Sequence, residues 1–369
     1  MSREAEVLVV GAGLHGCSAA LQLARRGVAV TVLEKDHAGR HASGVNAGGV
    51  RTLGRHRAEI PIALASRELW HQIRELVDDD CGFVPCGQVK IAETDDDLAV
   101  LRERVEGLQA AGFQHEVLVD GETLREIVPA ASPACPGGIW VKDDGAANPY
   151  RTTMAFRRAA ARAGAVFHEG VRVLEVQREA DRWRLATSAG EFRAPRLVNC
   201  AGAWGGQLAA RLGDPVPLQP IAPMLMVTAR MPPFIIPTAG VVNRPLSFKQ
   251  VNNGTVIIGG GHLGTPFPDE NRTRLDFRKL AISARTASAV FPIMRQARIV
   301  RCWAGIEGRM PDDIPVIGPG SREGVFHAFG FSAHGFQLGP AVGGIIADLV
   351  TTGSSNLPIE AFRADRFAS

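Results

Sequence analysis

The sequence predicts an α/β protein in which a parallel-sheet domain is interleaved with an α+β domain built on a large mixed or antiparallel sheet. Residues 7–34 show a short apolar strand, a helical pattern and a second apolar strand, which is the βαβ texture of a parallel sheet. Residues 246–249 and 255–259 instead show short neighbouring strands, which favour antiparallel pairing. Glycine is abundant, at 41 of 369 residues, and it clusters in a few loops where backbones can approach another group closely.

The composition excludes several classes of protein. Hydrophobic residues make up 46% and charged residues 21%, so the chain is neither disordered nor a coiled coil. The net charge is +3 with both signs interspersed, which gives no indication of a nucleic-acid partner. We find no apolar run near the ~18 residues of a membrane span and no signal-peptide pattern at the N-terminus. Six scattered cysteines indicate reduced thiols, so we expect a cytoplasmic protein.

The strongest local signal is a glycine motif between the first two strands. Gly11, Gly13 and Gly16 form GxGxxG directly after the apolar run at 7–10, and Glu34 ends the next strand. In such a unit the first glycine allows a tight turn, the second lets the backbone approach a pyrophosphate, and the third lets helix pack on strand. The acid can accept a hydrogen bond from a ribose hydroxyl. The pattern predicts a dinucleotide site, but it does not separate NAD from FAD.

The rest of the chain predicts further elements without more βα units of the nicotinamide type. A loop at 39–56 is rich in glycine, histidine and arginine, which suits a planar ligand beside an anion. Helical periodicity follows at 60–77, 95–111 and 151–163, and strand patterns lie at 87–92, 137–141 and 325–329. Prolines are dense from Pro215 to Pro237, where we expect a pocket-shaping segment.

Five segments together resemble the D-amino-acid-oxidase-type FAD flavoproteins, in the branch of glycine oxidase, sarcosine oxidase and D-amino-acid or hydroxyproline dehydrogenase. They are the motif from Gly11 to Glu34, the loop Asn46–Arg51, LVNCAGAWG at 197–205, WAG with PDDIPVIG at 303–318, and GFSAHGFQLGP at 330–340. The resemblance implies a discontinuous FAD-binding Rossmann-like (GR2-type) domain of residues 1–80, 150–214 and 311–369. It implies a substrate domain of residues 81–149 and 215–310.

The resemblance also implies which residues bind the cofactor, with Glu34 at the adenosine ribose and the loops at 46–49 and 330–337 beside the flavin ring. We expect FAD to be bound non-covalently, because no cysteine has the spacing of the family's flavin-linking residue, and we expect no metal site. The residues expected to bind FAD are Gly11, Gly13, Leu14, His15, Gly16, Glu34, Lys35, Ser43, Asn46, Ala47, Gly48, Gly49, Val173, Ala201, Gly202, Trp204, Gly330, Ser332, His334, Gly335, Phe336 and Gln337.

The chemistry implied by the resemblance is oxidation of a carbon–nitrogen bond beside a carboxylate, with hydride passing to flavin and the imine hydrolysing afterwards. Such a reaction calls for a cation that clamps the carboxylate, preferably an arginine because it bonds bidentately. Arg51 is the first candidate and Arg309 the second, and His262 matches a histidine over the flavin in sarcosine-oxidase-like relatives. Glu307 stands where glycine-oxidase-like relatives carry their clamp arginine.

Two departures from the sarcosine-oxidase pattern bear on the electron acceptor and the substrate. Gln337 replaces a lysine of the final loop, and the strand at 256–258 lacks the lysine thought to favour oxygen attack on reduced flavin. The second departure favours a dehydrogenase with another acceptor over a peroxide-forming oxidase. The substrate is expected to be a cyclic, N-substituted or D-amino acid.

Other readings fit less well or remain open. Cys81 and Cys86, with the glycines at 259–264, formally suggest a disulfide reductase, but Pro85 lies within the cysteine pair and prolines at 266 and 268 prevent the required helix. Two alternatives stay open: a catalytic subunit of a hetero-oligomeric dehydrogenase with iron–sulfur or second-flavin partners, and an oxidase of N-substituted glycines.

Overall fold

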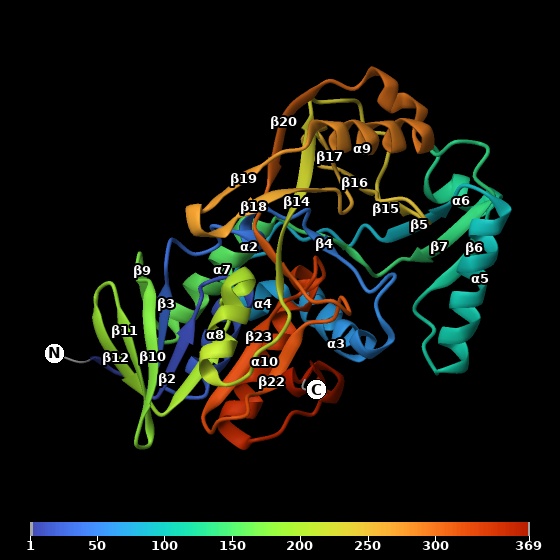
Figure 1. Cartoon of the computed structure of the whole chain (residues 1–369). Coiled ribbons are helices and arrows are strands. Elements are labelled where there is room, and N and C mark those ends of the chain that lie inside the picture. Colours follow the sequence, from blue (N-terminus) through green and yellow to red (C-terminus); the bar gives the residue numbers. More distant parts are fainter. Residues whose placement is uncertain (1–2, 368–369) are drawn as a thin grey trace.

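The computed structural model describes residues 3–367, and its lower half in Figure 1 is built on a six-stranded sheet. The strand order is β22-β23-β13-β2-β3-β9, parallel except for the antiparallel pair β22–β23. Apolar runs such as Val7–Val10 form these strands because both faces of the sheet are covered. The strands are β2 (Val7–Val10), β3 (Val30–Glu34), β9 (Val166–Glu169), β13 (Arg196–Asn199), β22 (Val316–Pro319) and β23 (Val325–Phe329).

Helices cover one face of this sheet, and a second, four-stranded sheet together with a helix covers the other. Val7 and Val9 pack among the helices, whereas Leu8 between them packs against the four-stranded sheet. The alternation follows from the two-residue period of a strand. The helices are α1 (Leu14–Arg25), α3 (Ile60–His71), α4 (Ile73–Val77), α7 (Pro149–Arg162) and α10 (Gly335–Thr352), with α8 (Gly205–Leu212) opposite; the small sheet has the strands β1 (Arg3–Glu4), β10 (Val173–Glu179), β11 (Arg182–Thr187) and β12 (Gly190–Ala194).

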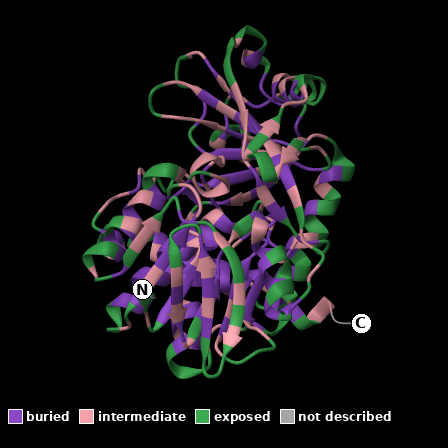
Figure 2. Ribbon diagram, turned by 60° about the vertical axis from the view of Figure 1, so that its left-hand side comes forward, coloured by how far each residue is buried: buried purple, intermediate pink, exposed green. Residues whose placement is uncertain are grey.

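An eleven-stranded, mostly antiparallel sheet forms the upper half of the molecule in Figure 1, with β5 and β15 as a parallel pair. It has its own apolar core, which includes residues of the strands and of the helices beside them. Buried residues, purple in Figure 2, lie in both halves of the molecule. The strands are β5 (Gln88–Ala92), β6 (Val117–Asp120), β7 (Gly137–Val141), β14 (Gln219–Thr228), β15 (Thr238–Val241), β16 (Ser247–Gln250), β17 (Val256–Gly259), β18 (Leu263–Phe267), β19 (Arg272–Arg274), β20 (Ile299–Ala304) and β21 (Glu307–Arg309), and its helices are α5 (Asp95–Ala110), α6 (Gly121–Ile127) and α9 (Phe277–Val290).

Short elements complete the chain between the two large sheets. A two-stranded ribbon joins the loop after α2 to the segment before α7. Its strands are β4 (Gly49–Val50) and β8 (Gly145–Ala146), beside α2 (Ala42–Val45) and the 3₁₀ turns η1 (Arg57–Glu59), η2 (Gly202–Trp204), η3 (Pro268–Glu270), η4 (Pro292–Gln296), η5 (Glu360–Phe362) and η6 (Ala364–Phe367).

The expected α/β architecture with a mixed, largely antiparallel second sheet is confirmed. The strands of the six-stranded sheet fall within 1–80, 150–214 and 311–369, and those of the eleven-stranded sheet within 81–149 and 215–310. The division into two domains at these boundaries stays a prediction. The proline-dense segment contains β14, a ten-residue strand for which the sequence gives no strand signal, because prolines usually exclude a central strand. No helix in the described chain is long and apolar enough to cross a membrane.

The close packing of α10 on α1 leaves no room for a side chain at Gly343. A Cβ atom there would lie 2.1 Å from the Ser18 Oγ and 2.6 Å from the Ser18 carbonyl carbon. Gly343→Ala should therefore destabilise the protein by about 1–3 kcal/mol through overpacking. The neighbouring Gly344 has nothing within 4 Å of its Cβ position, so Gly344→Ala should stabilise the helix slightly. Thermal unfolding of the two variants tests this, and equal melting temperatures would contradict it.

Candidate active site

The glycine motif forms a tight corner between β2 and α1. Gly11 has a φ of +105°, and a Cβ there would lie 2.4 Å from the Cys200 carbonyl oxygen. A Cβ on Gly16 would lie 1.9 Å from the Gly11 carbonyl oxygen, so the helix can start at this distance only with glycine. Gly13 caps the helix, and Ser43 Oγ accepts the Leu14 N–H at 2.9 Å. The N-terminus of α1 thus faces the cavity described below, where its dipole favours an anion.

Glu34 ties this corner to the end of β3. Its Oε2 accepts the Ala12 N–H at 2.7 Å and its Oε1 accepts the Asp36 N–H at 2.9 Å. Burial raises the pKa of Glu34 above its usual value, and the two backbone donors oppose that shift. The carboxylate lines the cavity and retains acceptor capacity on both oxygens, which suits a ribose hydroxyl.

Beyond Glu34, side chains from both halves of the molecule meet around Lys35. Its Nζ donates to Asn271 Oδ1 at 2.5 Å and lies 4.0 Å from the centre of the Trp204 ring. The His41 ring approaches the same tryptophan, and burial lowers the pKa of His41 to about 4. The cluster closes one end of the cavity with an aromatic face and a cation.

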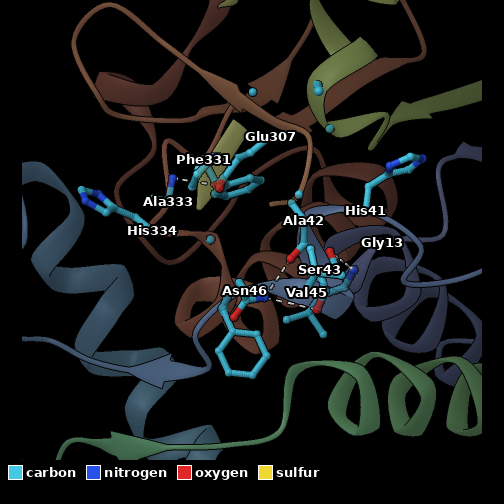
Figure 3. Close-up of a pocket in the computed structure, with 18 of the residues that line it drawn as sticks. Gly13, His41, Ala42, Ser43, Val45, Asn46, Glu307, Phe331, Ala333 and His334 are labelled. Carbon is cyan, nitrogen blue, oxygen red and sulfur yellow. Dashed lines mark hydrogen bonds between the residues drawn. The ribbon is translucent and has the colours of Figure 1, made fainter. Parts of the chain in front are cut away.

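A cavity of about 860 Å³ runs from Glu34 to the eleven-stranded sheet, which is within the size range of cofactor sites. The residues around its central part are drawn in Figure 3. Two helices begin at it, α1 after Gly13 and α10 after His334. Its far wall is formed by residues of the large sheet, which are Gln88, Val89, Lys90, Pro223, Met224, Leu225, Thr238, Ala239, Gly240, Val241, Leu246, Ser247, Gly260 and Gly261.

Most residues expected at the site line this cavity, and five do not. Gly16 lies in the helix–turn contact already described. Ser332 turns its Oγ to the Met310 N–H, and Gln337 is fully buried against α3, where its side chain donates to the Ala63 carbonyl. The lining residues are Gly11, Gly13, Leu14, His15, Glu34, Lys35, Ser43, Asn46, Ala47, Gly48, Gly49, Arg51, Val173, Ala201, Gly202, Trp204, Gly330, His334, Gly335 and Phe336.

The other two residues outside the cavity are catalytic candidates. Arg309, the last residue of β21, does not line the cavity; it is 47% exposed and forms an ion pair with Asp313, with Nε 2.6 Å from Oδ1. His262 follows β17, and its backbone carbonyl accepts the Met224 N–H. The His262 ring does not line the cavity. Burial and then the charge of Lys279 lower the pKa of His262. The structure therefore brings Arg51, but neither Arg309 nor His262, to the cavity.

Arg51 and Lys90 form a cationic wall of the cavity, although sequence patterns singled out only Arg51. The Arg51 guanidinium donates to the Leu53 carbonyl at 2.6 Å. Lys90 lies on β5, where burial lowers its pKa and the nearby charge of Arg51 lowers that pKa further. Within residues 3–367 no carboxylate is within 4 Å of either charged group. Two neighbouring cations without a carboxylate partner make a site for an anion.

Buried carboxylates behind Arg51 are used by other groups. Asp144 accepts the N–H groups of Thr52 and Leu53 at 2.8–3.0 Å, and Glu116 accepts the Gly54 N–H at 2.7 Å while binding Arg104. These bonds hold the turn that follows Arg51. The guanidinium is thereby positioned without being neutralised.

Arg55, which sequence patterns did not single out, links this turn to the beginning of α10. It is 1% exposed and donates to the His334 carbonyl at 3.0 Å and to Gln337 Oε1 at 3.1 Å. Burial, and after it the charge of Arg51, lower the pKa of Arg55 to about 9. Arg55 fixes the 46–55 loop against the 330–337 segment.

Lys249 reaches the same loop from the strand β16. A Cβ on Gly48 would lie 2.9 Å from Lys249 Nζ, and that Nζ donates only a long bond, 3.5 Å, to the Ala147 carbonyl. Burial lowers the pKa of Lys249 to about 8. The strand at 256–258 does lack a lysine, but its neighbour in the sheet supplies one at the glycine loop. The missing lysine at 256–258 was the reason to favour a dehydrogenase over an oxidase. Because Lys249 lies beside the glycine loop, that reason no longer holds.

The features above define a dinucleotide-binding redox enzyme, and comparison with known proteins gives the family. The chain matches the model of the FAD dependent oxidoreductase family, DAO, over residues 6–349. It is 28% identical to glycine oxidase of Geobacillus kaustophilus over 359 residues, 95% of this chain and 94% of that protein. It is 27% identical to the hydrogen cyanide synthase subunit HcnC of Pseudomonas aeruginosa, covering 100% and 97%. The structure of L-proline dehydrogenase from P. horikoshii superposes with a TM-score of 0.92 at 27% identity, covering 100% and 98%.

The protein therefore belongs to the FAD-dependent oxidoreductases of the DAO family, and FAD is its cofactor. The residues present fit that group. The corner at Gly11–Gly16 and the N-terminus of α1 suit a pyrophosphate, Glu34 suits the adenosine ribose, and the backbone of Asn46 to Gly49 lines the cavity on the way to the eleven-stranded sheet.

Loss of the Glu34 charge should weaken FAD binding. In Glu34→Gln the amide would place a donor beside the Ala12 and Asp36 N–H groups, so a hydrogen bond to a charged group, worth about 1.5–3 kcal/mol, would be lost. We expect FAD dissociation constants of the apoprotein to rise about tenfold or more, measured by flavin fluorescence titration. Glu68→Gln, at a side chain that is 66% exposed, is the matched control, and equal affinities in both variants would contradict this role.

Proposed function

We propose that the protein oxidises the carbon–nitrogen bond of an amino or imino acid, with a cyclic, N-substituted or D-amino acid as substrate. The observation that carries the proposal is the pair Arg51 and Lys90, two cations without carboxylate partners on the wall of the cavity. Such a pair suits a substrate carboxylate. The names of the relatives, a glycine oxidase and a proline dehydrogenase, support the same class of substrate.

The residues of the chain position the substrate and exclude water. Arg51 can bond a carboxylate with two N–H groups, and Lys90 adds charge from the adjacent strand. Met224, Leu225 and Leu246 form apolar wall, which lowers the local dielectric and strengthens these contacts. FAD, when bound, accepts the hydride from the carbon that carries the nitrogen. The imine product then hydrolyses in water.

Arg51 should determine substrate binding but not cofactor binding. Arg51→Ala should raise KM for an oxidisable amino acid about 100-fold, because a charged hydrogen-bonded contact worth about 2–5 kcal/mol is removed, and FAD content should stay unchanged. Anaerobic bleaching of the flavin with a panel of glycine, sarcosine, proline and D-amino acids identifies the substrate. Arg102→Ala on the exposed side of α5 is the control. Unchanged KM in Arg51→Ala would remove Arg51 from the site, and bleaching by no amino acid would exclude the proposed function.

Two electron acceptors are supported by different observations. A buried cation at Lys249 favours dioxygen, because it stabilises the negative charge that oxygen gains on reduction. Similarity to HcnC, which is by name a subunit, favours a hetero-oligomer in which another chain takes the electrons.

The six cysteines, all free thiols, support a cytoplasmic location.

A peroxide assay in air separates these acceptors. If dioxygen accepts the electrons, Lys249→Met should slow peroxide formation about tenfold or more and leave anaerobic bleaching nearly unchanged. Lys142→Met, at an exposed lysine, is the matched control. Absence of peroxide from the wild type would instead point to a partner protein, and full peroxide formation by Lys249→Met would contradict the role given to this lysine.

A further inference from the structure

Glu307 places a carboxylate on the wall of the cavity, at a position where the resemblance leads one to expect an arginine. It begins β21, whose register pairs it with Ile221 of β14. Its Oε1 accepts the Ala333 N–H at 2.6 Å (Figure 3). No hydrogen bond to Oε2 is formed within the described chain, so that oxygen is free to accept one from a ligand.

No cation faces Glu307 from the elements packed around it. The paired part of β14 (219–221) and the turn η2 carry no charged side chain there. His334, in the adjoining loop, is directed to Glu59, with Nδ1 3.2 Å from Oε2. Arg309, on the same strand, pairs with Asp313. Burial therefore raises the pKa of Glu307 to about 7, opposed only by the Ala333 N–H.

The other buried bases along the cavity are already engaged or weakly basic. His15 stacks on Phe331 with ring centres 3.6 Å apart, and burial lowers its pKa to about 3. Burial likewise lowers the pKa of His334 to about 4, against its bond to Glu59. Glu307, which is half-buried on the cavity wall, has a pKa of about 7 and can therefore take a proton at neutral pH.

The cavity is thus electrically asymmetric. Arg51 and Lys90 form a positive region, and Glu307 adds a carboxylate to the wall of the same cavity. An amino acid in water is a zwitterion, with an ammonium group of pKa about 8–10 and an ionised carboxylate. Its ammonium group suits a carboxylate such as Glu307, as its carboxylate suits Arg51 and Lys90.

We propose that Glu307 accepts the proton of the substrate's ammonium group before oxidation. The N–H bond breaks, an O–H bond forms at Glu307 Oε2, and the electron pair of that N–H bond stays on nitrogen as its lone pair. That lone pair becomes the second bond of the C=N group as the hydride leaves the neighbouring carbon for FAD. Glu307 then returns its proton to water after the product leaves. This assignment rests on the proposed function.

The pH profile of Glu307→Gln tests the assignment. In the wild type, the kcat/KM of anaerobic flavin reduction should fall below about pH 7, where Glu307 becomes protonated. Glu307→Gln should need the free amine, so its kcat/KM should rise about tenfold per pH unit up to the pKa of the substrate amine, whereas the wild type should level off above about pH 7. Glu323→Gln, at a side chain that is 93% exposed, is the matched control. A pH-independent loss in Glu307→Gln, or none, would overturn the assignment.

A binding measurement keeps the assignment testable without turnover. Trimethylglycine carries a carboxylate and a permanent cation, but no N–H proton and no lone pair, and it is followed by the change it causes in the flavin absorption spectrum. The wild type should bind it about tenfold more tightly at pH 8.5 than at pH 6, as Glu307 ionises, and Glu307→Gln should show no such change. The same pH dependence in both proteins would overturn the assignment. Normal bleaching with an unaltered Glu307→Gln profile rejects this inference alone, whereas bleaching by no amino acid rejects the proposed function.

Discussion

The close packing of α1 against α10 is the constraint on which the site depends. These helices are more than 300 residues apart in the chain, yet Gly339 and Gly343 of α10 lie against Leu14 and Ser18 of α1 with no space for a side chain. The contact brings the beginning of α10 beside the Gly11–Gly16 corner. Two positive helix ends therefore face one cavity, which is the condition for holding an anionic dinucleotide whose ring gains charge on reduction.

The part of the site around Arg51 depends on a different principle. There, buried carboxylates accept backbone N–H groups instead of pairing with Arg51. Asp144 and Glu116 accept the N–H groups of the turn after Arg51, although each comes from a distant part of the chain. A carboxylate placed directly on the guanidinium would have neutralised it. Since the turn is fixed by its backbone, Arg51 keeps its charge for a ligand, and the cost of burying it is reduced by the nearby negative charges.

The cofactor half was predictable from the sequence because its signals are local. Strand, glycine turn, helix and Glu34 follow one another within 28 residues, so their spatial relation is set by the βαβ geometry. Lys90 and Lys249 were not predictable, since each lies on an ordinary strand. The pairing of β5 with β15 brings Lys90 to the cavity, and the pairing of β16 with β17 brings Lys249 beside the Gly48 loop. Arg309 and His262 do not line the cavity. Arg309 is the last residue of β21 and His262 lies in the turn between β17 and β18, and the direction of a side chain at such positions is not visible in the sequence.

Glu307 lies on the cavity although Arg309 of the same strand does not. It precedes Arg309 by two positions on β21, yet it lies on the cavity with Ala333, while Arg309 is at the surface with Asp313. The strand is short and ends at Arg309, so the outer residue is free to turn toward solvent. The Glu307 carboxylate accepts a single backbone N–H, and partial desolvation raises its pKa. The chain thus combines a positive region, Arg51 with Lys90, and a titratable carboxylate on one cavity, and this polarity selects a zwitterionic ligand in one orientation.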